Sequence, residues 1–380
     1  MKVTQAVLVF LGILFIAGNF SFVFMLNGQY YYLWIVAAVA LSVFLLTAFA
    51  IFEFFTTKKR KRNFAAFVMV FILLSVIPTV YHQSIERIPT VDAEIDIFEY
   101  EPFGNNGRVV AMDGKVSFKM EEPLVKIDGA TAMYPLYAAF VQATYPQKEY
   151  NPYASEVMVN TTPIAYSKLF DGEVDLIFAA APSESQRKTA EQKGLTLKMT
   201  PIGREAFVFF VHHKNAVDNL SIEQIKNIYA GEMTNWQEVG GKGDEIRAFQ
   251  RPADSGSQSA LEKLMGDVPI MEAPSENIAA GMGGIINEVS KYRNYKNAIG
   301  YTFRFYSTEM VGNDEIKLLS INGVTPSKET IRTGEYPISS EFYAITAGTD
   351  NPNIQPFIDW ILSAEGQAIV EKVGYVPVTK

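Results

Sequence analysis

The feature that most constrains this chain is a series of three long apolar runs within its first 80 residues. They cover residues 3–26, 31–55 and 64–80, and few polar residues interrupt them. About 20 apolar residues are needed to cross the hydrocarbon core of a membrane, with about 17 as the lower limit. We therefore expect three transmembrane helices. A cleaved signal peptide fits the first run poorly, because the run is long, lacks a clear small-residue cleavage site and is followed by two more.

The basic segment Lys58–Arg62, interpreted as a loop between the second and third runs, predicts how the chain is oriented. Loops rich in lysine and arginine stay in the cytoplasm. The N-terminus would then also be cytoplasmic, and the third helix would lead outward. Tyr30–Tyr32 and Trp34 would form the aromatic belt at the outer surface. The sequence thus predicts a multi-pass protein of the cell membrane whose large C-terminal part is extracytoplasmic.

The composition excludes several kinds of site. Cysteine is absent from all 380 residues, which excludes disulfides, thiol catalysis and zinc–thiolate centres. His212 and His213 are adjacent, so on a strand they should face opposite sides and make a poor metal-binding pair. We expect no metal site and no cofactor. Residues 1–80 hold six basic residues and one acidic residue, which is a net charge of +5. Since the whole chain has a net charge of −8, the other 300 residues carry a net charge of −13. An acidic extracytoplasmic part argues against nucleic acid as a partner.

After a connector at 81–123, short strands alternate with helices, and glycine-containing turns separate them. Within the connector, residues 108–120 suggest a hairpin around Asp113-Gly114. The expected strands are 124–127, 174–179, 206–211, 298–303 and 342–346; the expected helices are 134–144, 163–171, 221–230, 255–265 and 353–363. This alternation is typical of an α/β fold, in which helices cover both faces of the sheet.

Three helix starts share a composition suited to binding an anion. They are Ala130–Ala132, Thr161-Thr162 and Ser255–Ser257, and Arg251 precedes the last of them. The first amides of a helix have no partner within the helix, and the helix dipole places partial positive charge there. Gly256 lets the backbone approach a ligand, and Arg251 offers a fork of donors that matches an oxyanion. Each start alone is equally well explained as an ordinary cap, whereas three together predict a shared oxyanion site.

Residues 124–380 also resemble a known family in an ordered set of short motifs. The matching segments are 128–131 (DGAT), 134–136, 172–175, 228–231, 234–236, Arg251 with 255–257 (SGS), 298–301, 326–331, 334–338, 363–367 and 374–377. Each is weak alone, but their order resembles that of the periplasmic phosphate-binding proteins. These PstS-like proteins are the solute receptors of ABC-type phosphate importers.

The resemblance implies a two-lobed periplasmic-binding-protein clamp of type II that closes on its ligand. Lobe 1 would comprise 124–202 plus 307–380, and lobe 2 would comprise 203–306. The ligand-binding residues implied by the family are Ala130, Thr131, Ala132, Thr162, Arg251, Ser255, Gly256 and Ser257. The implied ligand is inorganic phosphate or a similar small anion, the implied partner is an ABC permease, and no enzymatic activity is implied.

The chain departs from the family pattern at Ala180. Typical members carry a Ser-Asp pair shortly before the proline that follows the second strand, whereas this chain has Ala179-Ala180 before Pro182. The usual aspartate accepts a proton from monohydrogen phosphate and so selects for a protonated oxyanion. Several ligands therefore stay open: phosphate, another anion, a phosphoester, a small acidic metabolite, or none.

Two other functions remain open at this point. A membrane-bound sensor or interaction protein could use the same clamp, because three helices are more than tethering requires. An extracellular phosphoesterase is disfavoured, because the sequence shows no credible nucleophile–base pair and no metal cluster.

Overall fold

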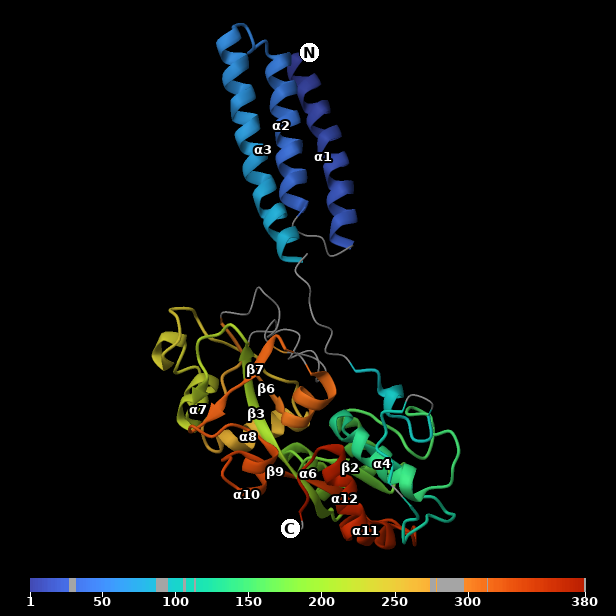
Figure 1. Cartoon of the computed structure of the whole chain (residues 1–380). Helices are drawn as coiled ribbons and strands as arrows, with labels where there is room; N and C mark the ends of the chain where they lie inside the picture. The colour runs from blue at the N-terminus through green and yellow to red at the C-terminus, as the bar shows by residue number, and fades with distance from the viewer. Residues whose placement is uncertain are drawn as a thin grey trace. The chain divides into compact units, whose positions relative to one another are not determined.

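The computed structural model forms two compact units, Met1–Pro89 and Thr90–Lys380 (Figure 1). The residues that it describes are 1–26, 32–86, 95–104, 107–112, 114–273, 278, 297–312 and 314–378.

The first unit consists of three helices that lie side by side: α1 (Lys2–Leu26), α2 (Leu33–Ile51) and α3 (Lys58–Glu86) (Figure 1). The basic segment Lys58–Arg62 was expected to be a loop. In the structure it forms the first turns of α3. Lysine and arginine are good helix formers, so their charge does not prevent helix formation. Of the expected aromatic belt, Tyr30 and Tyr31 lie outside the described residues, and Trp34 is 69% exposed on α2.

Two of the described helices, at Lys2–Met25 and Leu33–Ile51, are long and apolar enough to cross a membrane by length and composition. Their side chains are mostly exposed rather than packed in a protein core; Phe15, for example, is 74% exposed. The expected third span, 64–80, lies inside α3 and is not one of these two helices.

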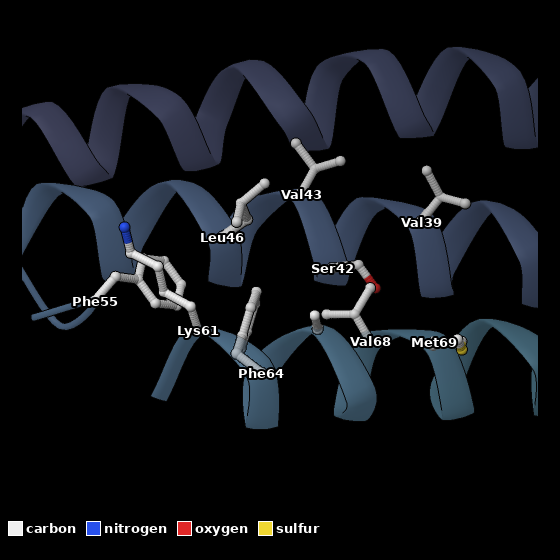
Figure 2. Close-up of a pocket in the computed structure, with 10 residues that line it drawn as sticks. Val39, Ser42, Val43, Leu46, Phe55, Lys61, Phe64, Val68 and Met69 are labelled. Carbon is white, nitrogen blue, oxygen red and sulfur yellow. The ribbon is translucent and has the colours of Figure 1, made fainter. Parts of the chain in front are cut away.

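An open apolar groove of about 750 Å³ runs between α2 and α3 (Figure 2). Its described lining is Val39, Ser42, Val43, Leu46, Phe55, Lys61, Phe64, Ala65, Val68 and Met69. Although this groove is larger than any cavity given below, it offers almost no polar surface. It is therefore a poor place to bind a small anion.

The second unit is built on a mixed sheet whose strands follow the order β1-β2-β9-β3-β6-β5, with β7 also paired to β3. The strands are β1 (Ile127–Gly129), β2 (Leu176–Ala179), β3 (Lys198–His212), β5 (Arg247–Ala248), β6 (Ala298–Phe303), β7 (Ile316–Leu318) and β9 (Ser339–Thr346). A second, two-stranded sheet pairs β4 (Asn219–Leu220) with β8 (Ser320–Ile321). The β1–β2 and β5–β6 pairs are parallel, and the other pairs of the large sheet are antiparallel.

The long strand β3 joins the two halves of the large sheet. Its residues 198–206 pair with β9, whereas 207–211 pair with β6. The register with β9 shifts between Pro201 and Gly203. A Cβ atom on Gly203 would lie 2.2 Å from Cζ of Phe342, so glycine leaves room for the Phe342 ring to pack over β3 at this point.

The helices of this unit are α4 (Tyr134–Thr144), α5 (Thr162–Phe170), α6 (Glu184–Gln192), α7 (Ile222–Ala230), α8 (Gly256–Met265), α10 (Lys328–Thr333), α11 (Ile354–Leu362) and α12 (Ala364–Val373). The α/β fold and the five predicted helices are confirmed. Local caps explain the agreement: Ser221 and Gln224 form a capping box, and Ser255 caps α8.

The expectations for residues 95–127 fared less well. The described residues 107–112 and 114–120 contain no strand, so the predicted hairpin is wrong there, and Asp113 lies outside the described residues. The first strand begins at Ile127 rather than at Leu124. Part of the assigned connector packs on the second unit: the amide of Phe103 donates to Oε1 of Gln142 at 2.6 Å, and Tyr100 is buried. These contacts hold residues 95–104 against the rest of the second unit.

Candidate functional site

Seven of the eight predicted ligand-binding residues line one cavity of about 360 Å³. They are Ala130, Thr131, Thr162, Arg251, Ser255, Gly256 and Ser257. The eighth, Ala132, lines a smaller adjoining cavity that shares Ala130, Thr162 and Gly256 with the first. The residues come from the turn after β1, the start of α5 and the start of α8, so the structure brings together the three helix starts that the sequence singled out.

Backbone N–H donors are concentrated at these helix starts. Among the described residues, the amides of Thr131, Ala132, Thr162, Gly256 and Ser257 have no hydrogen-bond partner within the protein. They belong to first turns, where the geometry of a helix leaves amides unpaired. Most of these residues are buried, so water satisfies the amides poorly and an anion satisfies them well.

Arg251 adds a full positive charge to the same cavity, and its Nε and Nη1 atoms are buried. Its backbone amide donates to Oη of Tyr301 at 3.0 Å and to Oε1 of Gln258 at 3.1 Å. The Tyr301 hydroxyl also donates to Gln258 Oε1. Burial raises the pKa of Tyr301, so the hydroxyl keeps its proton and remains a donor. A strand and a helix thereby fix the backbone from which the guanidinium extends.

Asp128 braces the first turn against the start of α5. The side chain is fully buried, and its oxygens accept from the Gly129 amide and from Nδ2 of Asn160, both at 2.7 Å. The backbone carbonyl of Asn160 in turn accepts from Oγ1 of Thr131 at 3.2 Å. Burial raises the pKa of Asp128, whereas these bonds and Lys168, 3.7 Å away, oppose the rise. Apart from the acidic residue in the turn, no pattern in the sequence indicates this brace.

We expect Asp128→Asn to lower the free energy of unfolding by about 1–3 kcal/mol, because one of two buried bonds is lost and amide donors then face each other. The affinity for any ligand of the cavity should fall as well, since Asn160 no longer fixes Thr131. Denaturant unfolding and calorimetric titration would measure the two effects. Asp171→Asn is the matched control, because Asp171 pairs with Lys193 at the surface and should cost little. Equal losses in both variants would refute the brace.

Comparison with known proteins places the second unit in a family. Residues 102–365 match the sequence model of the PBP superfamily domain. The chain is 30% identical over 258 residues to the phosphate-binding protein PstS of Bacillus subtilis, an alignment that covers 67% of this chain and 80% of that protein. It is 26% identical over 260 residues to PstS of Borreliella burgdorferi, covering 67% and 90% of the two chains.

The chain belongs to the PstS family of phosphate-binding proteins.

Solved structures agree with this assignment. One is a putative phosphate ABC transporter substrate-binding protein with bound phosphate from Clostridium perfringens, with 25% identity and a TM-score of 0.52. The similarity covers 67% of this chain and 99% of that one. An ABC-type phosphate transport receptor from Vibrio cholerae, at 21% identity and a TM-score of 0.50, shares the fold over 66% and 99% of the two chains. The resemblance read from the ordered motifs is confirmed, and the first 101 residues lie outside the family match.

The departure from the PstS family pattern at Ala180 coincides with the adjoining cavity, which measures about 40 Å³. Ala180 lines this cavity just after β2, and its carbonyl accepts from the Tyr166 hydroxyl at 2.8 Å. A Cβ atom on Gly256 would lie 3.6 Å from Cβ of Ala180 and 3.2 Å from Oγ1 of Thr162. The start of α8 therefore lies against Ala180 and the start of α5, with little room for a side chain between them.

Sequence reasoning missed several residues of the larger cavity. Ile95, Ile97, Tyr153, Asn160 and Tyr306 also line it. The two isoleucines belong to the segment that was expected to be a connector, 81–123. They carry no polar pattern that points to a ligand, so only the fold brings them to the site.

The expectation that His212 and His213 face opposite sides is wrong. Their rings stack with centroids 4.4 Å apart, and a carboxylate oxygen of Glu315 lies 3.2 Å from His212 Nε2 and 3.4 Å from His213 Nδ1. The alternation of a strand does not apply, because β3 ends at His212. The amide of Lys214 donates to His212 Nδ1 at 3.1 Å, which places the ring proton on Nε2. A metal would need that Nε2 lone pair, so the geometry of this trio opposes metal binding.

Proposed function

We propose that this chain is a membrane-anchored extracytoplasmic receptor that binds phosphate or a related oxyanion and delivers it to an ABC-type importer. One observation carries the proposal: unpaired amides from three helix starts and the Arg251 guanidinium converge on one largely buried site. The described lining of the larger cavity holds no carboxylate, histidine or lysine. It therefore offers donors for an oxyanion but no nucleophile–base pair, which supports binding rather than catalysis.

Calorimetric titration of the full chain in detergent micelles would test this proposal. We expect phosphate to bind with a micromolar dissociation constant, and sulfate is the tetrahedral anion used for comparison. If neither phosphate nor any phosphate ester released or absorbed heat on titration, the proposed oxyanion site would be rejected. Co-purification of an ABC permease with the tagged chain would support delivery to an importer, whereas a signalling partner alone would favour a sensor.

The proposed receptor closes as two lobes, 124–202 with 307–380 and 203–306. β3 changes its partner from β9 to β6 after Ala206, close to the proposed boundary, which supports a division near this point. Contacts across the proposed boundary lie beside the site: the Asp254 carboxylate accepts from the hydroxyls of Ser183 and Ser185, both at 2.6 Å. In this proposal these bonds form on closure and break when the ligand leaves.

The proposed anchor crosses the membrane three times, with α3 as the third span. The chain has no cysteine, so single cysteines can report its orientation without further changes. In Thr57→Cys the reporter precedes α3, and in Lys115→Cys it lies at an exposed position of the second unit. We expect a membrane-impermeant maleimide to label intact cells only at position 115, and position 57 only after permeabilisation. Labelling of both positions from the same side would mean that α3 does not cross.

A further inference from the structure

A small apolar cavity opens beside the proposed oxyanion site and is the most informative feature that the receptor function leaves unexplained. The two cavities share Ala130, Thr162 and Gly256 as walls. The rest of the lining of the smaller one, of about 40 Å³, is Ala132, Met133, Ala180, Glu205, Phe303, Ser340, Glu341, Phe342 and Tyr375, and most of the surface that they expose to it is apolar. A water molecule needs about 10–15 Å³ on this measure, so the cavity has room for a group of two or three heavy atoms. Its largely apolar wall suits a methyl or methylene group better than water.

The larger cavity supplies donors in excess of acceptors. Its donors are backbone amides, hydroxyls and the Arg251 guanidinium, and its described lining contains no carboxylate. Three unprotonated phosphate oxygens match this set. The hydroxyl of monohydrogen phosphate does not match it equally well, because its proton needs an acceptor and the acceptors left in the lining are neutral.

Two carboxylates in the wall of the smaller cavity, Glu205 and Glu341, are the alternative acceptors. Glu341 is exposed and accepts from the Tyr343 hydroxyl at 3.1 Å. The Glu205 carboxylate is also engaged within the protein. Oε1 accepts from the Ala206 amide at 2.8 Å and lies 3.4 Å from Nε of Arg304, and Oε2 accepts from the Phe305 amide at 3.0 Å. These contacts hold the carboxylate within the fold, which makes Glu205 a part of the wall rather than a partner for the ligand.

We propose that this site takes a monosubstituted phosphate, R–PO₃²⁻ with a small apolar R, in preference to inorganic phosphate. The three unprotonated oxygens occupy the donor cup, and the substituent enters the cavity beside Ala180. The inference rests on the proposed receptor function and specifies its ligand class. Methylphosphonate and methyl phosphate are the simplest members, and the size of the cavity excludes bulky esters such as nucleotides with the base in this position.

The test compares four anions on the full chain in detergent micelles by calorimetry at pH 8: phosphate, methylphosphonate, methyl phosphate and sulfate. We expect at least one of the methyl compounds to bind about tenfold or more tightly than phosphate, because a buried methyl is gained and an unpaired hydroxyl is avoided. Tighter binding of phosphate than of both methyl compounds would overturn the inference and leave the receptor function intact. Silence from all four would reject the receptor function itself.

Two substitutions at Ala180 distinguish the effect of filling the cavity from the effect of adding a hydrogen-bond acceptor. Ala180→Val fills the cavity with carbon, and Ala180→Asp fills it while adding a carboxylate acceptor. We expect both to lower the affinity ratio of methylphosphonate to phosphate by about tenfold or more. Only the aspartate should raise the affinity for phosphate itself. An unchanged ratio in both variants would show that the substituent does not occupy this cavity. If a variant fails to fold, the order of the four anion affinities in the wild type tests the inference alone.

Discussion

Replacing Arg251 by alanine is expected to lower the affinity of the receptor for its oxyanion more than a hundredfold. A charge-assisted hydrogen bond contributes about 1.5–3 kcal/mol, and the planar guanidinium offers two such bonds to one oxyanion. Two bonds at the lower value already correspond to about 3 kcal/mol, or roughly two powers of ten in the dissociation constant. Arg251 is also the one charged side chain in the described lining of the larger cavity, so no neighbour there compensates for its loss. Calorimetric titration with the tightest-binding anion would measure the effect.

Arg251→Lys is the informative companion to the alanine variant. Lysine keeps the charge but loses the planar fork, so we expect an affinity between that of the wild type and that of Arg251→Ala. In both variants the backbone amide at 251 can still donate to Tyr301 and Gln258, which should preserve the local fold. Retention of wild-type affinity by the alanine variant would mean that the ligand does not bind in this cavity.

The helix starts of the site were predictable because caps are local. Three residues act through the backbone around them: Pro163 within the first turn of α5, Ser255 as the cap of α8, and Gly256. Each lies where the sequence indicated. Their convergence was less predictable from local rules. In the sheet β1 and β5 lie at opposite ends of the strand order, although the segments that follow them line one cavity. That meeting depends on the long strand β3, which pairs with both halves of the sheet and carries a bulge.

The parts that could not be predicted depend on tertiary contacts. The Asp128–Asn160 bond joins residues 32 positions apart, and no pattern near either residue announces it. Ile95 and Ile97 reach the site from a segment without regular periodicity. The histidine pair shows the opposite failure, in which a local rule was applied one residue beyond the end of its strand.

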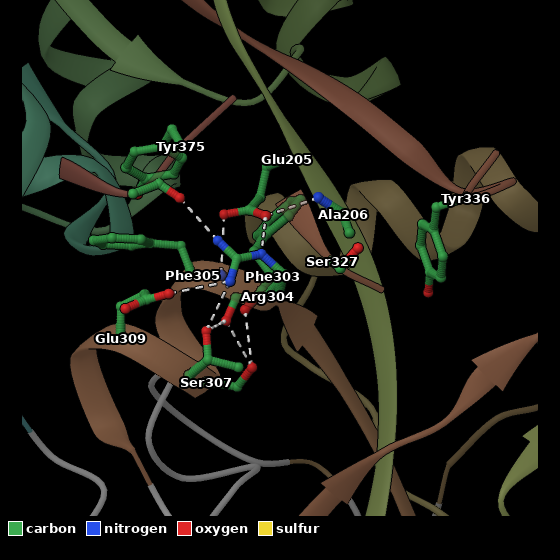
Figure 3. A network of polar contacts seen from close by, with 12 residues as sticks. Glu205, Ala206, Phe303, Arg304, Phe305, Ser307, Glu309, Ser327, Tyr336 and Tyr375 are labelled. Carbon is green, nitrogen blue, oxygen red and sulfur yellow. Dashed lines mark hydrogen bonds and ion pairs between the residues drawn. The ribbon is translucent and has the colours of Figure 1, made fainter. Parts of the chain in front are cut away.

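Arg304→Ala is expected to lower the free energy of unfolding of the second unit by about 3–5 kcal/mol, because it breaks a buried ion pair from one side. The Arg304 side chain is 7% exposed, and its guanidinium contacts three parts of the fold (Figure 3). Its Nε lies 3.4 Å from Oε1 of Glu205 on β3, Nη1 donates to Oε1 of Glu309 at 3.2 Å, and Nη2 donates to the Gly374 carbonyl after α12 at 2.8 Å. Since whole domains are stable by only about 5–15 kcal/mol, the loss should be plain in urea unfolding followed by Trp236 and Trp360 fluorescence.

The pH dependence of this loss follows from Glu205. Burial raises the pKa of Glu205 to about 7, while Arg304 and two backbone amides oppose the rise. A carboxyl group whose pKa is higher in the folded state stabilises the fold below its unfolded pKa of about 4.5, and that contribution is lost as the pH rises through the folded pKa. Removing Arg304 raises the folded pKa further, so the decline should continue above pH 7. The variant should therefore lose more stability relative to the wild type at pH 8 than at pH 6.

The matched control is Arg332→Ala. Arg332 also pairs with carboxylates, at 2.6 Å from Glu371 and 3.7 Å from Glu329, but its side chain is 44% exposed. Exposed pairs contribute little because water and salt screen them, so we expect a small loss with no steepening above pH 7. If Arg304→Ala cost no more than this control, the buried Glu205–Arg304 pair would not be a major contributor to the stability of the fold. A pH-independent loss in Arg304→Ala would instead show that Glu205 stays ionised without its partner, and that burial does not dominate its titration.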